Sequence, residues 1–489
     1  MRLADLFVPE LAPLPAGIEN LEITGITADS RAVEPGFLFA ALPGSRSDGL
    51  TYVPQAIAKG AVVLLTPADA PLESVSIPVL RATDPRRALA RIAARFHGGQ
   101  PETAIAVTGT NGKTSVVEFT RQIYATLGRR SASLGTIGLV KADGSVYGAL
   151  TTPDPVSLHR MLAELAGEGV THVAFEASSH GLDQRRLDGV DLAAAAFLNL
   201  GRDHLDYHAT LDEYFAAKLR LFDTLLTPGR PAVVNADDPR SEAVIAVARQ
   251  RGSDVLTVGR NGDTLQLVAS EPDGFGQRLR IRRDDVEHDV HLPLLGAYQA
   301  SNALAAAALA IATGEDPASA IAALSGLRGV KGRLDVVGEA AGGLVVVDYA
   351  HKPEALEAAL AALRPFAHGK LICVFGCGGD RDRGKRPIMG KIAVDNADRV
   401  IVTDDNPRSE KPEAIRAEIM AGAPGAIEIG DRAAAIAAAV DAMEKGDVVL
   451  IAGKGHETGQ IVGNTVIPFS DQDEARTALS SKTSGRHRP

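Results

Sequence analysis

The stretch that decides the fold reads Ala106-Val107-Thr108-Gly109-Thr110-Asn111-Gly112-Lys113-Thr114-Ser115. It closes an apolar run, 103–107, that predicts a buried strand, and it precedes 116–127, which predicts a helix. A glycine-rich turn between a strand and a helix points backbone N–H groups and a helix N-terminus at one place, and that place favours phosphate. Lys113 adds a mobile cation for terminal phosphates, and the Thr114 hydroxyl can reach a magnesium ion.

The spacing of this loop is Gly-x-x-Gly-Lys-Thr, which is shorter than the common nucleotide loop. Val107 stands where the first glycine of the common loop would be, so the loop is a shortened variant. An ordinary turn is the alternative interpretation. The Lys-Thr pair at the mouth of a helix, directly after a strand, favours phosphate binding over that alternative.

Length and composition limit the class of protein. A chain of 489 residues is too long for one core, so two to four domains are expected. The net charge of −10 argues against a nucleic-acid partner, because affinity for phosphate backbones needs a basic surface. The two cysteines, Cys373 and Cys377, are too few for a zinc site or a secreted disulfide framework, and they predict two small thiols in a reducing compartment.

Membrane insertion is not expected from the sequence. No charged segment followed by an apolar one begins the chain, and no long uncharged apolar run occurs in it. The alanine-rich stretch 303–312 is too short for a membrane span and predicts a buried helix. A cytoplasmic location is the resulting expectation. The chain is also expected to be a monomer.

Strand and helix patterns divide the chain into three regions and predict an α/β fold. Region 1–100 has short strands and turn clusters, and the Gly-Gly and Pro of 97–101 predict a linker. Region 101–337 alternates apolar strands with helical patterns, which predicts a central phosphate-loop domain with a largely parallel sheet. Within it, 263–290 predicts a small antiparallel excursion. Region 338–489 predicts a Rossmann-like C-terminal domain, with a disordered tail from Ser480.

The last region repeats one pattern, in which a strand ends in a polar or glycine-rich cluster. The predicted strands are 344–347, 371–375, 400–402 and 448–451. Ligands of open α/β sheets bind beyond the carboxyl ends of the strands. Parallel strands would bring the clusters to one edge, which predicts a ligand site there.

Three further features could complete the site of the central region. Glu176 follows a predicted strand and would suit a magnesium ligand, although a solvated loop residue is the commoner case. The loop 203–208 carries acids and histidines that could hold metal, and a capped helix start is nearly as good an interpretation. Lys218 lies on the predicted helix 211–222, where a lone lysine is usually exposed.

Taken in order, these motifs resemble the central domain of the muramyl ligases, ATP-dependent amide-forming enzymes of peptidoglycan precursor synthesis. The segments that carry the resemblance are 108–115, 176–180, 203–208 and 214–218, together with 27–31, 348–354, 376–389, 405–408 and 453–457. The C-terminal segments resemble the members that add the third residue of the peptide. The resemblance covers nearly the whole chain, and several motifs in one order are more specific than any single one.

The resemblance implies a reaction and a set of residues. ATP would phosphorylate the side-chain carboxylate of D-glutamate on UDP-N-acetylmuramoyl-L-alanyl-D-glutamate, and the acyl phosphate would be attacked by a diamino acid. The implied catalytic residues are Lys113, Lys218 and His204, and the implied Mg²⁺ ligands are Thr114, Glu176, His204 and a carbamylated Lys218. The implied ATP contacts are Gly109, Thr110, Asn111, Gly112, Lys113, Thr114, Ser115, Asn302, Arg333 and Asp348.

The resemblance also implies two further subsites. The uridine-nucleotide contacts would be Ser30, Ser45, Arg46 and Ser47, in and before the turn 44–49. The muramoyl-peptide contacts would be Thr151, Thr152, Ser178, Gln184 and Arg186. The diamino-acid contacts would be Arg381, Asp405, Asn406, Pro407, Arg408, Gly453 and Glu457. Two positions depart from the family pattern, Gln299 and Leu150, where asparagine is common. Gln299 therefore has no assignment, and Leu150 puts one substrate hydrogen bond in doubt.

The segment 405–408, Asp-Asn-Pro-Arg, resembles the motif associated with meso-diaminopimelate rather than lysine. Meso-diaminopimelate has a far carboxylate that Arg408 can pair with bidentately, and lysine would leave that arginine unpaired. A plain turn is the alternative for Asn406-Pro407. Two rival functions stay open: a lysine-adding ligase of the same family, and a nucleotide-binding regulatory protein without catalysis.

Overall fold

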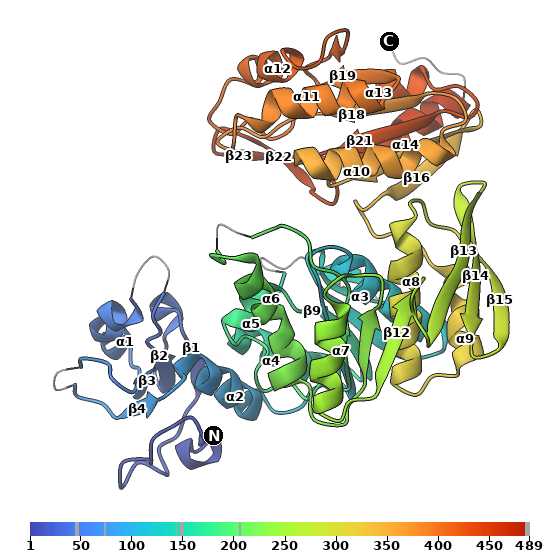
Figure 1. Ribbon diagram of the computed structural model, residues 1–489. Coiled ribbons are helices and arrows are strands. Elements are labelled where there is room, and N and C mark those ends of the chain that lie inside the picture. Colours follow the sequence, from blue (N-terminus) through green and yellow to red (C-terminus); the bar gives the residue numbers. More distant parts are fainter. Residues whose placement is uncertain (45–47, 73–74, 143, 147–150, 205–206, 485–489) are drawn as a thin grey trace. The chain divides into compact units, whose positions relative to one another are not determined.

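The computed structural model describes residues 1–44, 48–72, 75–142, 144–146, 151–204 and 207–484 (Figure 1). The chain forms two compact units. Unit 1 comprises Met1–Gln266 and Leu304–Ile321, and unit 2 comprises Leu267–Ala303 and Ala322–Pro489. No helix within the described ranges combines the length and the apolar character needed to cross a bilayer.

Unit 1 begins with a four-stranded parallel sheet in the order β1-β2-β3-β4. Apolar side chains of its strands form two small cores, one on each face. The elements of this part are η1 (Leu3–Leu6), β1 (Gly25–Thr27), η2 (Ser30–Ala32), β2 (Phe37–Ala40), η3 (Gly49–Tyr52), α1 (Val53–Ala58), β3 (Val63–Pro67), β4 (Val79–Ala82) and α2 (Pro85–His97). The helix α2 ends where the linker was predicted, and Gly98 follows with a φ of 58°.

The larger sheet of unit 1 has β5 (Thr103–Thr108) between β9 (His172–Glu176) and β10 (Ala194–Phe197), and all three strands are parallel. Parallel strands covered on both faces are continuously apolar, as 103–107 is. The register pairs Val107 with Glu176, so Glu176 lies beside the start of the glycine-rich loop. The remaining strands are β6 (Ser131–Gly135), β7 (Gly138–Lys141), β8 (Gly144–Val146), β11 (Ala232–Asn235) and β12 (Val255–Gly259).

Helices cover both faces of this sheet, as the alternation of side chains along β5 requires. Ala104 and Ala106 join a core formed with α4, α5, α6 and α7, while Ile105 and Val107 are buried on the face to which α3 packs. These helices are α3 (Lys113–Thr126), α4 (Pro155–Gly167), α5 (Ser179–Asp183), α6 (Leu211–Arg220), which continues as the π-turn η4 (Leu221–Leu225), and α7 (Ser241–Gln250). The predicted helix 116–127 thus begins earlier, at Lys113.

The boundaries between the units fall within β13 (Leu265–Asp273), within α8 (Tyr298–Ala312) and before the last residue of α9 (Pro317–Ala322). The antiparallel excursion predicted at 263–290 is confirmed by the hairpin of β14 (Gly276–Arg283) and β15 (Val286–Leu292). The alanines of α8 up to Ala310 are buried, as predicted for 303–312, and Ala312 at its end is half-buried. The helix is followed by α9 (Pro317–Ala322) and η5 (Ala323–Gly326).

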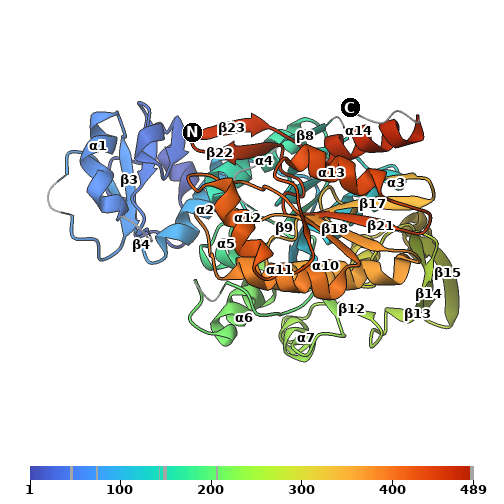
Figure 2. The ribbon, with the colours of Figure 1, turned by 90° about the horizontal axis from the view of Figure 1, so that it is seen from above.

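The main sheet of unit 2 has the strand order β16-β17-β21-β18-β19-β20. Figure 2 shows α10 and α11 on one side of β18 and β21, and α13 and α14 on the other. The strands are β16 (Asp335–Ala340), β17 (Gly343–Asp348), β18 (Leu371–Phe375), β19 (Arg399–Val402), β20 (Ile427–Glu428), β21 (Val448–Ala452) and the hairpin β22 (Gly459–Val462) with β23 (Thr465–Pro468). The helices are α10 (Pro353–Leu363), η6 (Arg364–Phe366), α11 (Lys385–Asn396), α12 (Pro412–Met420), α13 (Arg432–Asp441) and α14 (Asp471–Thr483).

The register of this sheet aligns the carboxyl ends of four strands. Asp348 pairs with Ala452, Ala452 with Phe375, and Phe375 with Val402. The clusters that follow these strands therefore start at one edge, as predicted from the sequence. The parallel α/β fold is confirmed in both units.

The prediction of a disordered tail from Ser480 is wrong for the residues that can be compared. The helix α14 continues to Thr483 because Ala475, Ala478 and Leu479 are buried and Ser470 accepts a hydrogen bond from the Asp473 N–H at its start. Polar composition at 480–484 reflects the exposed face of this helix. Residues 485–489 lie outside the described ranges.

Candidate active site

The glycine-rich loop between β5 and α3 is held against the end of β10. The Thr110 N–H donates to the Asn199 carbonyl at 2.9 Å, and the Asn111 N–H donates to Oδ1 of Asn199 at 2.8 Å. Gly112 has a φ of 86°, which a residue with a side chain adopts only with strain. A Cβ on Gly109 would stand 2.9 Å from Cβ of Leu198. The loop is thus closely fitted to its neighbours, and it leads into the first turn of α3.

Two lysines meet at one carbonyl oxygen of this loop. Nζ of Lys113 and Nζ of Lys218 donate to the Gly109 oxygen at 2.7 and 2.8 Å. Lys218 is 1% exposed, and its ammonium lies 4.3 Å from the centre of the Tyr214 ring. Burial first, and then the charge of Lys113, hold the pKa of Lys218 well below its ordinary value. Lys218 is therefore not the exposed helical lysine that its position alone would suggest.

Glu176 lies at the end of β9 and contacts the first turn of α3. Its Oε1 accepts from the Thr114 hydroxyl at 2.9 Å and from the Thr136 N–H at 2.7 Å. A Cβ on Gly135 would stand 2.2 Å from that oxygen, so a side chain there would displace the Glu176 carboxylate. The side chain is 1% exposed. Hydroxyl and carboxylate oxygens are the donors that Mg²⁺ prefers, so the Thr114–Glu176 pair fits a magnesium site.

His204 lies in the loop before α6, with a φ of 53°. Its ring is 4.9 Å from that of His180 and 6.1 Å from that of Tyr214, measured between centroids. Tyr214 in turn bonds to the Thr110 hydroxyl, with 3.2 Å between oxygens, so contacts connect His204 to the glycine-rich loop. Among the described residues no group of three or more His, Cys, Asp or Glu side chains is arranged to hold a metal.

His208 is the second histidine of the loop 203–208 and is not among the residues that the family resemblance implies for the site. Its side chain is buried, and Nε2 has no hydrogen-bond partner within the described ranges. Burial, as the largest cause, lowers the pKa of its imidazole. Its ring lies 5.3 Å from that of Tyr214 and 5.8 Å from that of His180. The sequence could have placed His208 near His204, because both lie in the short loop 203–208.

The structure brings together the residues predicted to contact the muramoyl peptide. The Thr152 hydroxyl lies 2.9 Å from that of Ser178, and Arg186 donates to the Thr152 carbonyl at 2.6 Å. Arg186 also donates to Oε1 of Gln184 at 2.8 Å, and burial lowers the pKa of its guanidinium. Thr151 lies 3.1 Å from Thr136 between hydroxyl oxygens.

The predicted uridine-nucleotide residues are separate from that group. Ser30 is buried at the start of η2, and its hydroxyl donates to Oε1 of Gln55 at 3.1 Å. Ser45, Arg46, Ser47 and Leu150 lie outside the described residues.

In unit 2, Arg333 precedes β16 and interacts with Asp348, the last residue of β17. Oδ2 of Asp348 accepts from the Leu334 N–H at 2.7 Å, and burial raises the pKa of its carboxyl. The Arg333 guanidinium lies 5.4 Å from the centre of the Tyr349 ring. Asn302 lies on α8 and donates from Nδ2 to Oε1 of Gln299 at 2.9 Å, so the unassigned Gln299 is its buried partner.

The segment 405–408 meets the segment 453–457 at the aligned carboxyl edge of unit 2. Nδ2 of Asn406 donates to Oε2 of Glu457 at 2.9 Å, and a Cβ on Gly453 would stand 2.7 Å from Oδ2 of Asp405. Burial raises the pKa of Asp405. At Glu457 burial acts in the same sense, but bonds from Lys454 and Asn406 outweigh it and lower the pKa. Lys454, which sequence reasoning missed, is fully buried.

Arg408 has a strained backbone, with a φ of 51°, and a guanidinium that donates to the Gly379 carbonyl at 2.9 Å. Its backbone bonds to the hairpin β22–β23: the Arg408 N–H donates to the Ile461 carbonyl at 3.0 Å, and the Gly463 N–H donates to the Arg408 carbonyl at 2.8 Å. The exposed Arg381 bonds locally, to the Asp380 carbonyl at 3.0 Å. Of the predicted diamino-acid set, Arg381 is thus the member held least firmly.

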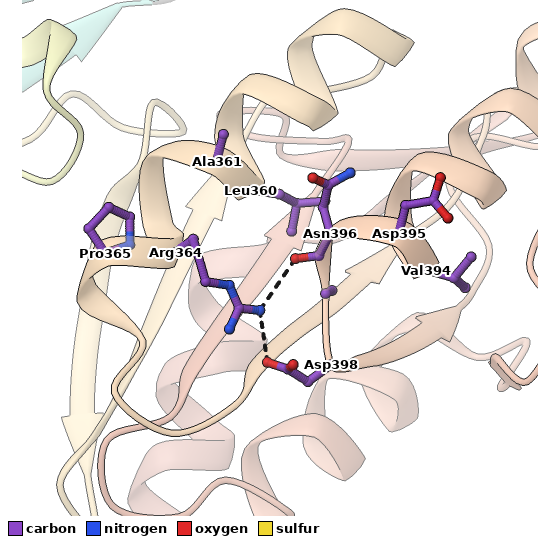
Figure 3. A pocket seen from close by; sticks show the side chains of 9 residues that line it. Leu360, Ala361, Arg364, Pro365, Val394, Asp395, Asn396 and Asp398 are labelled. Carbon is purple, nitrogen blue, oxygen red and sulfur yellow. Dashed lines mark hydrogen bonds and ion pairs between the residues drawn. The ribbon is translucent and has the colours of Figure 1, made fainter.

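A pocket of unit 2 lies at the opposite edge of the sheet (Figure 3). Arg364 crosses it and donates to Oδ2 of Asp398 at 2.8 Å, and that oxygen also accepts from the Leu371 N–H, at the start of β18. The pocket contains none of the predicted site residues. The two cysteines are free and buried, and burial raises the pKa of each thiol to about 12. Neither feature contributes to the candidate site.

Three segments of the chain match families of known proteins. They are "Mur ligase family, catalytic domain" at residues 22–97, "Mur ligase middle domain" at 107–310 and "Mur ligase, glutamate ligase domain" at 332–455.

Curated relatives and solved structures agree with these matches. The chain is 56% identical to a protein of Bradyrhizobium diazoefficiens over 99% of this chain and 100% of that one, and 57% identical to one of Brucella melitensis over 97% of each. Both are named UDP-N-acetylmuramoyl-L-alanyl-D-glutamate–2,6-diaminopimelate ligase. A solved structure with the same name has a TM-score of 0.75 and 34% identity and covers 99% of both chains. A Thermotoga maritima MurF ligase in complex with ADP, 20% identical with a TM-score of 0.61, has the same fold. This chain belongs to the Mur ligase family.

Proposed function

We propose that this chain is the ATP-dependent ligase that adds meso-diaminopimelate to UDP-N-acetylmuramoyl-L-alanyl-D-glutamate, in peptidoglycan precursor synthesis. The observation that carries the proposal is the contact between segments 405–408 and 453–457. Through it Arg408 and the ionised carboxylate of Glu457 both belong to one edge of the sheet. Relatives more than half identical over nearly the whole chain carry the name of this activity.

The work is divided among three domains. Residues 1–100 bind the uridine nucleotide, residues 101–337 bind ATP, and residues 338–489 bind the amino acid. Ser30 and segment 45–47 serve the nucleotide, while Thr151, Thr152, Ser178, Gln184 and Arg186 hold the muramoyl peptide. The network among Thr152, Ser178 and Arg186 supports this role, because it presents several polar groups on neighbouring segments.

The first chemical step transfers a phosphoryl group. A carboxylate oxygen of D-glutamate forms a bond to the γ-phosphorus of ATP, the bond to the β–γ bridging oxygen breaks, and ADP leaves. Such transfers depend mainly on positioning and charge neutralisation. Backbone N–H groups of 109–115 and the ammonium of Lys113 receive the phosphates. Asn302, Arg333 and Asp348 hold the adenosine part of ATP.

Thr114, Glu176, His204 and Lys218 would hold Mg²⁺, which supplies neutralisation of phosphate charge when bound. Lys218 fits this set if its amine adds to carbon dioxide. The ammonium first loses one proton, and the neutral amine then forms an N–C bond while one C–O π bond of carbon dioxide breaks. A second proton leaves the nitrogen, so the cation becomes a carbamate anion. The lowered pKa of Lys218 supports this step, because a neutral amine is the nucleophile. Lys113 and His204 complete the catalytic set.

In the second step the amine of the diamino acid attacks the acyl carbon, the amine loses a proton, phosphate leaves, and an amide forms. Arg408 pairs with the far carboxylate of meso-diaminopimelate and Glu457 accepts its far ammonium, with Arg381, Asp405, Asn406, Pro407 and Gly453 completing the pocket. Lysine lacks the far carboxylate and would leave Arg408 unpaired. The enzyme works as a monomer in the cytoplasm, without a nucleic-acid partner.

The test compares the two amino acids in one assay. Purified protein with ATP, Mg²⁺ and the UDP-dipeptide should release phosphate with meso-diaminopimelate and at a much lower rate with L-lysine. Comparable rates would identify a lysine-adding ligase instead. ATP binding without product from either amino acid would favour the regulatory protein, and an unimpaired Lys113→Ala variant would contradict the role of the loop.

A further inference from the structure

Lys454 is a fully buried lysine at the carboxyl edge of the unit 2 sheet, directly after Gly453. Its Nζ donates to Oδ1 of Asn406 at 3.0 Å and to Oε2 of Glu457 at 2.9 Å. A buried ammonium group needs such partners, because an unpaired charge in the interior is costly. Lys454 has no exposed surface, so it acts on a ligand through its neighbours: Asn406 and Glu457 by hydrogen bonds, and Asp405 through its charge.

The first consequence concerns the amide of Asn406. Its Oδ1 accepts from Lys454 and also from the Ile461 N–H at 2.9 Å, while its Nδ2 donates to Oε2 of Glu457. Turning the amide over would place its NH₂ group against two donors and its oxygen against a carboxylate. The ammonium therefore fixes which end of the Asn406 side chain faces Glu457.

The second consequence concerns the Glu457 carboxylate. Its bonds from Lys454 and Asn406 both end on Oε2, and the side chain is 32% exposed. Oε1 takes part in neither of these bonds. Burial raises the pKa of the neighbouring Asp405. Burial acts in the same direction on Glu457, but the bonds from Lys454 and Asn406 outweigh it and lower the pKa of Glu457.

We propose that Lys454 is a positioning residue for the diamino acid, which holds the Asn406 amide and the Glu457 carboxylate in one orientation with Oε1 of Glu457 directed at the far ammonium of the substrate. The inference rests on the proposed function, since it names the residue that prepares the same subsite. Lys454, within the segment 453–457, thus takes part in amino-acid recognition without contacting the substrate itself.

The test substitutes Lys454→Met, which keeps the length and apolar stem and removes the ammonium. The KM for meso-diaminopimelate should rise about tenfold or more, because one partner of a buried charge pair is lost. The KM values for ATP and the UDP-dipeptide should stay within about twofold, since a positioning role is confined to one subsite. An unchanged KM for the amino acid, or equal increases in all three, would overturn the proposal.

Lys391→Met is the matched control. Lys391 also pairs with a carboxylate, Oδ2 of Asp395, at 2.8 Å, but its side chain is 72% exposed. Exposed pairs contribute little, so this variant should show the kinetics of the unmodified enzyme. Thermal unfolding of both variants shows whether either has lost its fold. If Lys454→Met fails to fold, Lys454→Gln keeps a hydrogen-bonding group there, and the same KM criteria apply to it.

Two further measurements separate positioning from general destabilisation. Removing the ammonium should raise the pKa of Glu457, so the acid limb of the pH profile of 1/KM for the amino acid should move to higher pH. Four other charged or titratable groups that interact with Glu457 keep their side chains in the variant: Tyr349, Asp405, Arg432 and His456. Asp405 also loses the charge of Lys454, so the pH profile is compared with that of the Glu457→Gln enzyme with and without Lys454→Met. An acid limb that stays in place would contradict the proposed orientation.

The second measurement is a double-mutant cycle with Glu457→Gln. If Lys454 acts through Glu457, Lys454→Met should add less than about twofold to the KM of the Glu457→Gln enzyme. If the two substitutions instead multiply their separate effects on the KM for meso-diaminopimelate, the proposal is refuted. Failure of the proposed function is distinguishable, because the unmodified enzyme would then form no product with meso-diaminopimelate whatever the residue at 454.

Discussion

Substitution of Gly135 by alanine is the sharpest steric test of the Glu176 site. Gly135 ends β6, and its missing side chain leaves the space that Glu176 fills. An added Cβ would stand 2.2 Å from Oε1 of Glu176 and 2.7 Å from its Cγ and Cδ. Carbon and oxygen atoms cannot approach so closely, so the buried carboxylate would have to move by about 1 Å or more to regain ordinary contact.

That movement separates Oε1 from the Thr114 hydroxyl, now 2.9 Å away, and from the Thr136 N–H, now 2.7 Å away. A misplacement of about 1 Å in catalytic machinery costs roughly 100-fold in rate. Such a factor corresponds to about 2.7 kcal/mol of lost transition-state stabilisation. We therefore expect kcat/KM of Gly135→Ala to fall by about two orders of magnitude.

The assay is phosphate release with ATP, Mg²⁺, the UDP-dipeptide and meso-diaminopimelate, together with thermal unfolding to confirm that the variant is folded. Gly167→Ala is the control, because a Cβ there meets nothing within 4 Å and the residue lies in α4 of the same unit. The control should keep full activity. A folded Gly135→Ala enzyme with more than about half of the normal kcat/KM would refute the placement of Glu176 in the catalytic site.

Three other predictions use different observations. Lys218→Ala should be nearly inactive and partly rescued by a small carboxylic acid that replaces the carbamate, and a fully active variant in the phosphate-release assay would remove that role. Arg408→Lys should raise the KM for meso-diaminopimelate by about tenfold, because a lysine cannot form the bidentate pair, and steady-state kinetics with an unchanged KM would contradict it. Burial lowers the pKa of His159 from 6.5 to about 4, so the unfolded chain binds an extra proton between these values. The free energy of unfolding should therefore fall by about 3 kcal/mol as the pH drops from about 6.5 to 4, and His159→Gln should show a flatter urea-denaturation profile across that range; an identical pH dependence in both proteins would argue against His159.

Periodicity and strand-end clusters predicted those parts of the fold that depend on local sequence. The run 103–107 became β5, and the four strands of the last region meet at one edge because parallel pairing sets their register. The helix α3 started earlier than predicted, since the apolar pattern does not mark Lys113 and Thr114 as helical. The tail at 480–484 was misread because the exposed face of a terminal helix has the composition of a disordered segment.

Contacts between distant segments could not be predicted in this way. Asn199 binds the loop at Asn111, 88 residues away, and Lys454 reaches Asn406 across 48 residues. Burial of Lys218 likewise depends on the meeting of α6 with the loop, which no pattern along α6 indicates. The roles of the site residues and the domain limits stay predictions.

The backbone connection between Arg408 and the β22–β23 hairpin bears on enzyme engineering. Arg408 exchanges hydrogen bonds with Ile461 and Gly463, and Asn406 accepts one from the Ile461 N–H. If residues 405–408 alone were grafted into a ligase that prefers another amino acid, these backbone groups would lose their hydrogen-bond partners. The two segments, 405–408 and 453–468, should therefore be exchanged together. Chimeras that exchange both should keep the loop 405–408 folded, whereas chimeras that exchange one segment should lose it.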